Sequence, residues 1–153
     1  MANKMRWRYG ETNPVVGIVP DTVTVEIGDL VYYENDQVKP ASSQANQATK
    51  ALNQSVFALK FLGVAMQASP LGKATGIRIA TTGVFEFDTP VKTFNLGDLI
   101  GIDELPGRTG LETQKVDTSV LAGAIGRVVR REPTATNAIL VYLKSKIIEG
   151  GVI

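Results

Sequence analysis

Residues 57–101 contain three apolar runs, FALKFLGVAM (57–66), GVFEFD (83–88) and LGDLIG (96–101). Each run is short and rich in Val, Ile, Leu or Phe, which is typical of β-strands. Each also holds a glycine where a strand can begin, bend or pass close to a neighbour. The runs carry no histidine, no cysteine and no nucleophile beside a base. This stretch therefore predicts a β-barrel or sandwich and offers no catalytic group.

Further short segments flank this stretch at spacings near ten residues, several of them with apolar and polar residues in alternation. We expect strands at 22–27, 30–33, 61–66, 77–80, 84–87, 91–94, 122–131 and 138–144, with turns at 34–37, 103–110 and 133–137. The buried positions are expected to include Val64, Phe85, Phe87, Leu99, Ile125 and Val141. About eight short strands predict a mainly β fold, either a small barrel or a sandwich.

One helix is expected over residues 42–59, with Ser42 or Ser43 as its N-cap. Apolar residues recur there at steps of three and four, which indicates one buried stripe: Ala45, Ala48, Leu52, Val56 and Leu59. We expect this amphipathic helix to pack on its own barrel, although a helix that binds a partner would show the same pattern.

The chain is expected to form one domain with extended ends. We predict an N-terminal arm at 1–20, a β-barrel domain at 21–146 and a C-terminal tail at 147–153. Prolines at positions 14 and 20 favour an edge strand or an extended arm for the piece between them.

Composition argues against an enzyme. The 153 residues include no cysteine and no histidine, so thiolate nucleophiles, zinc–thiolate sites and the commonest general base are all missing. Sixteen basic and fifteen acidic residues leave a net charge of +1, which disfavours nucleic-acid binding by bulk electrostatics. We expect no catalytic residue, no metal site and no cofactor.

Two clusters of charged residues are weaker candidates for function. Asp98, Asp103 and Glu104 could hold a divalent cation or act as an acid and base, but turn and loop positions explain them better. Basic residues of the C-terminal strands could form an edge that binds single-stranded nucleic acid: Arg127, Arg130, Arg131, Lys144 and Lys146. A solvated edge that discourages sheet-to-sheet pairing is the favoured interpretation of that cluster.

The N-terminal arm carries the only tryptophan of the chain. Trp7 and Tyr9 are residue types that interfaces favour, and Arg6 and Arg8 could pair with carboxylates of a partner. We therefore predict a partner-binding segment made of Arg6, Trp7, Arg8, Tyr9, Asn13 and Pro14. The alternative is that the two aromatic residues cover the open end of the barrel. On the first interpretation, loss of residues 2–13 is expected to leave the barrel folded.

The N-terminus has no apolar segment typical of a signal peptide, and no apolar run reaches the roughly 20 residues that cross a bilayer. We expect the protein to be made in the cytoplasm and to involve no membrane.

Four segments in order resemble the capsid cement, or head decoration, proteins of tailed bacteriophages. They are 61–66, 77–87, 96–101 and 124–128. In that family an early Val-Gly-Asp-Leu-Val-like segment is followed by a Gly-Val-Ala strand, a Gly-Val-Phe-Glu strand, a second Gly-Asp corner and an Ile-Gly strand. Here the same order extends over residues 22–144, and the ends of the chain lie outside the resemblance.

The resemblance implies a small β-tulip-like body on the outer surface of an HK97-like shell, bound to the major capsid protein. It also implies a homotrimer, a place in the virion after assembly in the host cytoplasm, and no cofactor or small-molecule substrate. The alternative function is a single-stranded nucleic-acid-binding module of the OB type.

Overall fold

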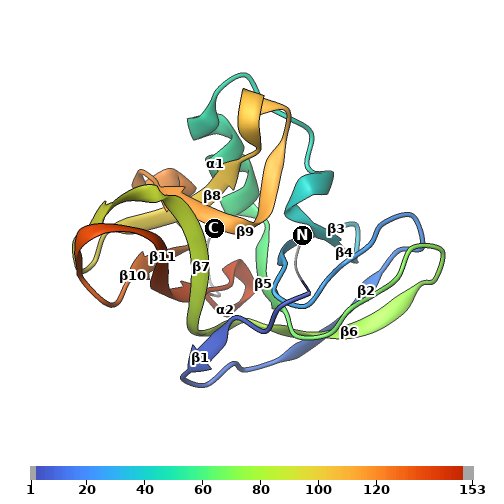
Figure 1. Ribbon diagram of the computed structural model, residues 1–153. Coiled ribbons are helices and arrows are strands. Elements are labelled where there is room, and N and C mark those ends of the chain that lie inside the picture. Colours follow the sequence, from blue (N-terminus) through green and yellow to red (C-terminus); the bar gives the residue numbers. More distant parts are fainter. Residues whose placement is uncertain (1–2, 150–153) are drawn as a thin grey trace.

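The computed structural model describes residues 3–149 and confirms a mainly β fold (Figure 1). Its elements are β1 (Trp7–Tyr9), β2 (Val15–Val19), β3 (Leu30–Glu34), β4 (Gln37–Pro40), η1 (Ala41–Ser43), α1 (Lys50–Leu59), β5 (Phe61–Ala65), β6 (Thr75–Ala80), β7 (Thr82–Phe94), β8 (Leu99–Glu104), η2 (Pro106–Arg108), β9 (Leu111–Thr118), η3 (Leu121–Gly123), β10 (Gly126–Val128), β11 (Glu132–Lys144) and α2 (Lys146–Glu149).

Five strands form a closed barrel in the order β7-β11-β10-β8-β9. The barrel closes because β9 pairs in parallel with β7, where Asp88 lies opposite Lys115. The 13-residue strand β7 pairs with β11 along one edge. Its other edge is shared by β9 and by β1, which places Trp7 opposite Phe85. The long strand β7 therefore joins the N-terminal segment to the barrel.

A second sheet has the order β2-β6-β5-β3-β4 and lies to the right of the barrel in Figure 1. Its two edge strands, β2 and β4, lie close together: a Cβ atom at Gly17 in β2 would collide with the Val38 side chain in β4. The sheet is therefore rolled. Strand β6 of the second sheet and strand β7 of the barrel are connected by the single residue Thr81. The chain therefore bends directly from one sheet into the other.

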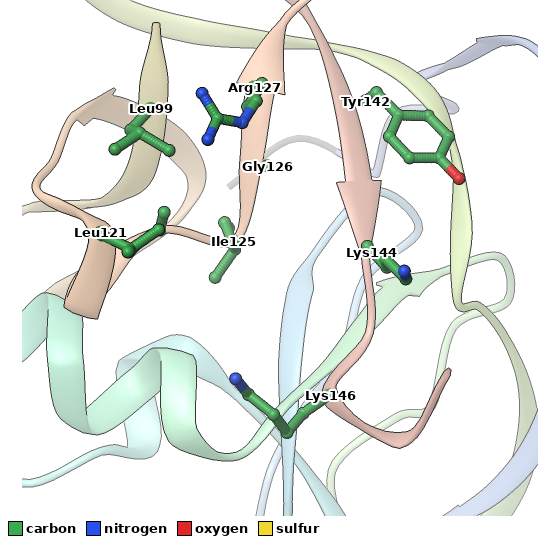
Figure 2. A pocket seen from close by; sticks show the side chains of 9 residues that line it. Leu99, Leu121, Ile125, Gly126, Arg127, Tyr142, Lys144 and Lys146 are labelled. Atoms are coloured by element: carbon green, nitrogen blue, oxygen red, sulfur yellow. The ribbon is translucent and has the colours of Figure 1, made fainter. Parts of the chain in front are cut away.

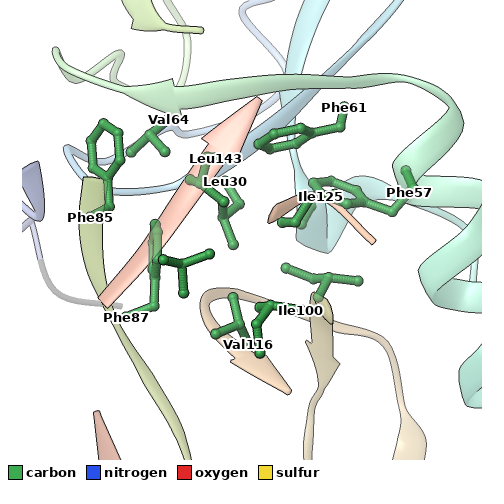
Figure 3. Packing of buried hydrophobic residues seen from close by; sticks show 14 of the residues in the cluster. Leu30, Phe57, Phe61, Val64, Phe85, Phe87, Ile100, Val116, Ile125 and Leu143 are labelled. Atoms are coloured by element: carbon green, nitrogen blue, oxygen red, sulfur yellow. The ribbon is translucent and has the colours of Figure 1, made fainter. Parts of the chain in front are cut away.

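The larger apolar core fills the barrel and extends between the barrel, α1 and the second sheet (Figure 3). The second sheet has an apolar core on each face. In strand β3, Leu30 belongs to the larger core and Val31 to a smaller core on the other face. Of the residues expected to be buried, five are buried: Val64, Phe85, Phe87, Ile125 and Val141. Leu99 is only half-buried, because it faces the outside of the barrel.

The helix differs from the expected one in length and in its buried face. It begins after Thr49, whose side chain accepts a hydrogen bond from the Leu52 amide at 3.1 Å, so neither Ser42 nor Ser43 is its N-cap. The predicted apolar stripe is wrong, because Leu52 and Leu59 are 47% and 61% exposed.

The face of α1 that is buried carries two amides as well as Phe57 and Ala58. The Gln54 side chain donates to the carbonyl oxygens of Ile102 and Thr118, and Asn53 donates to the Glu104 carboxylate at 2.6 Å. These polar side chains are buried because they satisfy groups of the neighbouring strands.

Several expected boundaries also move. Residues 22–27 form only one isolated bridge, between Val25 and Ser69, and cover the smaller core instead of joining a sheet. The turn expected at 133–137 lies inside β11, which absorbs it as irregularities in register. The strand expected at 122–131 is reduced to β10 by the preceding η3 turn, and Asp103 and Glu104 belong to β8.

The segment expected to be an irregular arm forms strands in both sheets. β1 extends the barrel sheet and β2 is an edge of the second sheet. Between them, the Thr12 carbonyl accepts hydrogen bonds from the backbone amides of Thr81 and Thr82, at the bend that joins the sheets. These contacts make the described part of the segment integral to the fold, so its loss is not expected to leave the barrel intact.

Arg6 fixes this segment most firmly. Its side chain is buried, and its Nε atom donates to Gln114 in β9 at 2.8 Å. Its guanidinium also donates to the Asp88 carboxylate and lies 5.7 Å from the centre of the Phe87 ring. Gln114 in turn donates to Asp29, just before β3, at 2.9 Å. This chain of contacts links the N-terminal segment, the barrel and the second sheet.

Arg6 and Arg8 provide a matched pair of substitutions. We expect Arg6→Ala to lower the free energy of unfolding by about 1–3 kcal/mol, because it removes a buried charged donor from Gln114. Arg8→Ala removes a half-exposed ion pair with Glu86 at 2.7 Å and should cost no more than about 1 kcal/mol. Urea denaturation of both variants measures the difference. Equal losses would show that the buried network does not support the fold.

Candidate functional site

The exposed part of the N-terminal segment consists of Met5, Trp7, Arg8 and Tyr9, here called the N-terminal surface. Trp7 and Tyr9 are 40% and 51% exposed although both belong to a strand. The Trp7 indole donates to the Gly10 carbonyl at 2.9 Å, and Arg8 is paired with Glu86. These internal bonds hold the Trp7 and Arg8 side chains in place on an edge strand.

The other residues predicted for partner binding lie elsewhere. Arg6 is buried inside the chain and does not share the N-terminal surface. Asn13 is exposed, but its side chain donates to the Thr82 hydroxyl at 2.7 Å and its carbonyl accepts from the Thr81 hydroxyl. Asn13 and the exposed Pro14 therefore shape the corner between β1 and β2.

Trp7 lies beside the barrel core. It is the register partner of Phe85, and a Cβ atom at Gly83 would lie 3.6 Å from the Trp7 indole and 3.2 Å from the Phe85 ring. Tyr9 is instead the partner of Val84, which precedes Phe85 in β7 and therefore points to the opposite face of the strand. Edge strand β2 adds two more exposed apolar residues, Val16 and Ile18, at 69% and 50% exposure.

The acidic residues considered as a cation site are separated by their partners. Asp98 accepts from the Asn95 amide within its turn, and Glu104 is paired with Arg108 at 2.9 Å. Asp103 pairs with Lys50 at 3.1 Å. Within residues 3–149, no group of three acidic side chains is placed to hold a metal ion.

Lys50 at the start of α1 joins two largely buried carboxylates, Asp103 of β8 and Asp117 of β9. Its ammonium lies 2.6 Å from Asp117, and Lys92 of β7 lies 2.7 Å from the other oxygen of the same carboxylate. Burial alone would raise the pKa of Asp117, but the hydrogen bonds from the two lysines outweigh burial and hold that pKa below its ordinary value. This cluster ties α1 to three strands and is structural.

The outer wall of the barrel carries a groove of about 460 Å³, here called the barrel groove (Figure 2). It is lined by Leu99, Leu121, Ala124, Ile125, Gly126, Arg127, Tyr142, Lys144 and Lys146. Figure 2 shows Leu121 and Ile125 on one side and Tyr142 with Lys144 on the facing strand β11. The groove therefore combines an aliphatic wall with three cationic side chains.

Pairing within the sheet places the groove beside the N-terminal surface. Tyr9 is the register partner of Val84, and Val84 is the partner of Tyr142. Tyr142 is the partner of Arg127, which in turn lies opposite Leu99. Directly paired residues of an antiparallel sheet share a face, so one row runs from β1 to the groove.

The basic edge expected from the sequence is brought together only in part. Arg127, Lys144 and Lys146 line the groove, whereas Arg130 pairs with Glu132 at 2.9 Å and Arg131 lies outside it. The aliphatic wall was not foreseen. The β11 side of the groove could have been predicted, because the two-residue spacing of Tyr142 and Lys144 puts both side chains on one face of a strand.

No protein-family model, curated protein or solved structure matches this chain. The helices of residues 3–149 are all too short or too polar to cross a membrane.

The lysine–aspartate cluster makes the stability of the fold depend on pH. Asp117→Asn should lower the free energy of unfolding at pH 7 by about 1–3 kcal/mol, because it weakens buried hydrogen bonds to charged groups. A carboxylate whose pKa is lowered by folding stabilises the fold above its unfolded pKa, near 3.8, and this stabilisation disappears as the pH falls through the folded pKa. The difference between variant and wild type should therefore shrink below about pH 4.

Urea denaturation across this pH range measures the effect. Asp36→Asn, on the exposed turn between β3 and β4, is the matched control and should behave as wild type. A difference for Asp117→Asn that does not change with pH would contradict the role given to the ionised carboxylate.

Proposed function

We propose that this protein is a capsid decoration protein, which binds the outside of an icosahedral phage shell and stabilises it by clamping major capsid subunits. In this proposal the protein belongs to the virion, is a homotrimer and is not an enzyme. The N-terminal surface is the observation that carries the proposal, because it offers exposed aromatic area on a rigid edge strand. No small-molecule substrate or cofactor takes part.

The segments that carry the resemblance to cement proteins support this proposal, because they supply the framework of the fold. Residues 61–66 contain β5, residues 77–87 form most of β6 and the start of β7, and residues 96–101 lead into β8. Gly63 shows why such a pattern is constrained: its φ is 156°, and a Cβ atom there would collide with the Ala80 carbonyl oxygen.

The rigidity of the N-terminal surface also supports the proposal. Arg6 anchors the strand from inside, and the Trp7 and Arg8 side chains are held by internal bonds. A surface that is ordered before binding loses less conformational entropy when it binds. Repeated contacts over a shell would add avidity to modest individual contacts.

The barrel groove keeps one alternative open, a module that binds single-stranded nucleic acid. The specific observation is that Arg127, Tyr142 and Lys144 meet on the outer wall of a five-stranded barrel. Basic grooves with aromatic platforms bind single strands in this way.

Cosedimentation with purified capsids of the phage that encodes the protein tests the proposal. Wild type should sediment with capsids and ignore oligothymidylate at an ionic strength of about 0.15 M. The double variant Trp7→Ala, Tyr9→Ala should bind capsids at least roughly tenfold more weakly, as expected for buried aromatic anchors. Leu71→Ala combined with Val91→Ala removes apolar residues that are also well exposed and should bind as wild type.

Binding to oligothymidylate with steep salt dependence, and none to capsids, would favour the alternative. If the double variant Trp7→Ala, Tyr9→Ala bound capsids with wild-type affinity, the N-terminal surface would not be the contact surface.

We expect the free protein to be a trimer. Val16 and Ile18 on edge strand β2 are exposed apolar residues that contacts between copies would cover. Sedimentation equilibrium at micromolar concentration measures the mass, and a stable monomer under those conditions would contradict this part of the proposal.

A further inference from the structure

We propose that the barrel groove binds an acidic segment of the capsid protein, an extended stretch in which carboxylate side chains alternate with aliphatic ones. This inference rests on the proposed function for the identity of the partner. The chemistry of the segment follows from the groove itself.

Charge complementarity is the first argument. Arg127 and Lys144 line the groove, and none of its nine lining residues is acidic. Arg127 donates to the Gly97 carbonyl at 3.0 Å, which fixes the guanidinium while using one of its five N–H donors. Lys144 is exposed on β11 and lies along the same groove (Figure 2). A carboxylate entering between them would accept charge-assisted hydrogen bonds.

The aliphatic wall is the second argument. Leu121 is 73% exposed at the tip of η3, and Leu99 is half-buried on β8. An aliphatic side chain set against them would remove apolar surface from water on both sides. Exposed leucine in a groove that also carries cationic side chains therefore favours an amphipathic occupant over a free inorganic anion.

The same wall argues against nucleic acid as the occupant. Single strands bind through successive aromatic platforms, one for each stacked base. Tyr142 is the sole aromatic residue among those that line the groove, and its other large apolar residues are aliphatic. A peptide with aliphatic side chains matches this lining better than a row of bases does.

Continuity with the N-terminal surface is the third argument. The row from Tyr9 through Val84 and Tyr142 to Arg127 crosses four adjacent strands. With about 4.8 Å between neighbouring strands, Tyr9 lies about 10 Å from Tyr142 along the sheet. A partner seated on the aromatic pair can therefore reach the groove without a change in the fold.

The probe is the capped peptide acetyl-Leu-Glu-Val-Glu-Leu-amide, titrated into the full-length ¹⁵N-labelled protein and followed by NMR. The amide signals of Ile125, Gly126, Arg127 and Tyr142 should shift in a saturable manner. The peptide with glutamine in place of glutamate should bind about tenfold more weakly, as expected when hydrogen bonds lose their charge.

Two exposed substitutions test the two halves of the groove. Lys144→Glu should weaken binding of the acidic peptide about tenfold or more, and Leu121→Ala should weaken it severalfold. Lys73→Glu makes the same change of charge in the exposed loop before β6 and should bind as wild type. Thermal unfolding of each variant checks that the fold is kept.

Equal affinity for the two peptides, wild-type affinity of Lys144→Glu, or tighter binding of oligothymidylate at the same amides would each overturn the inference. In the capsid assay, Lys144→Glu should sediment less than Lys73→Glu. If wild type fails to sediment, the proposed function fails, while the peptide titration still decides the chemistry of the groove. If both variants sediment equally well, only the assignment of the groove to the capsid fails.

Discussion

The burial of one guanidinium is the constraint on which the arrangement of the two sheets depends. Arg6 contacts Gln114 and Asp88, and Gln114 extends the network to Asp29 beside the second sheet. A buried cation must keep its partners, because leaving it or them unsatisfied costs more than an average hydrogen bond contributes. The barrel and the second sheet are thus held in one relative position by a residue outside both strand ladders.

This internal anchor explains how a short strand can present large side chains to solvent. β1 has three residues and, among the described strands, pairs with β7 alone, which by itself would give a weakly held edge. With Arg6 fixed immediately before it, Trp7 and Tyr9 have a defined place next to the row that leads to the barrel groove. The same short segment thus contains a buried anchor, Arg6, and two exposed aromatic residues, Trp7 and Tyr9.

The sequence was sufficient for the fold class and for the cores of most strands, because period-two alternation around Phe85 and Phe87 reports burial directly. It failed for α1, where Asn53 and Gln54 are buried through bonds to partners distant in sequence. It could not separate Arg6 from Arg8, since the difference arises from Gln114, 108 residues from Arg6. The sequence predicted the cluster of basic residues that partly lines the groove. It did not predict the aliphatic wall, because Leu121 is positioned by the η3 turn, which no sequence pattern indicated.

The sequence distance between Arg6 and its partners also orders events during synthesis. The partners of the N-terminal strand are translated long after it, Asp88 82 residues later and Gln114 108 residues later. Contacts so distant form late, and folds rich in them fold slowly. A nascent or truncated chain therefore lacks the aromatic surface in its final form. Only a chain whose barrel is complete would display this surface, so its presence reports that the C-terminal strands have folded.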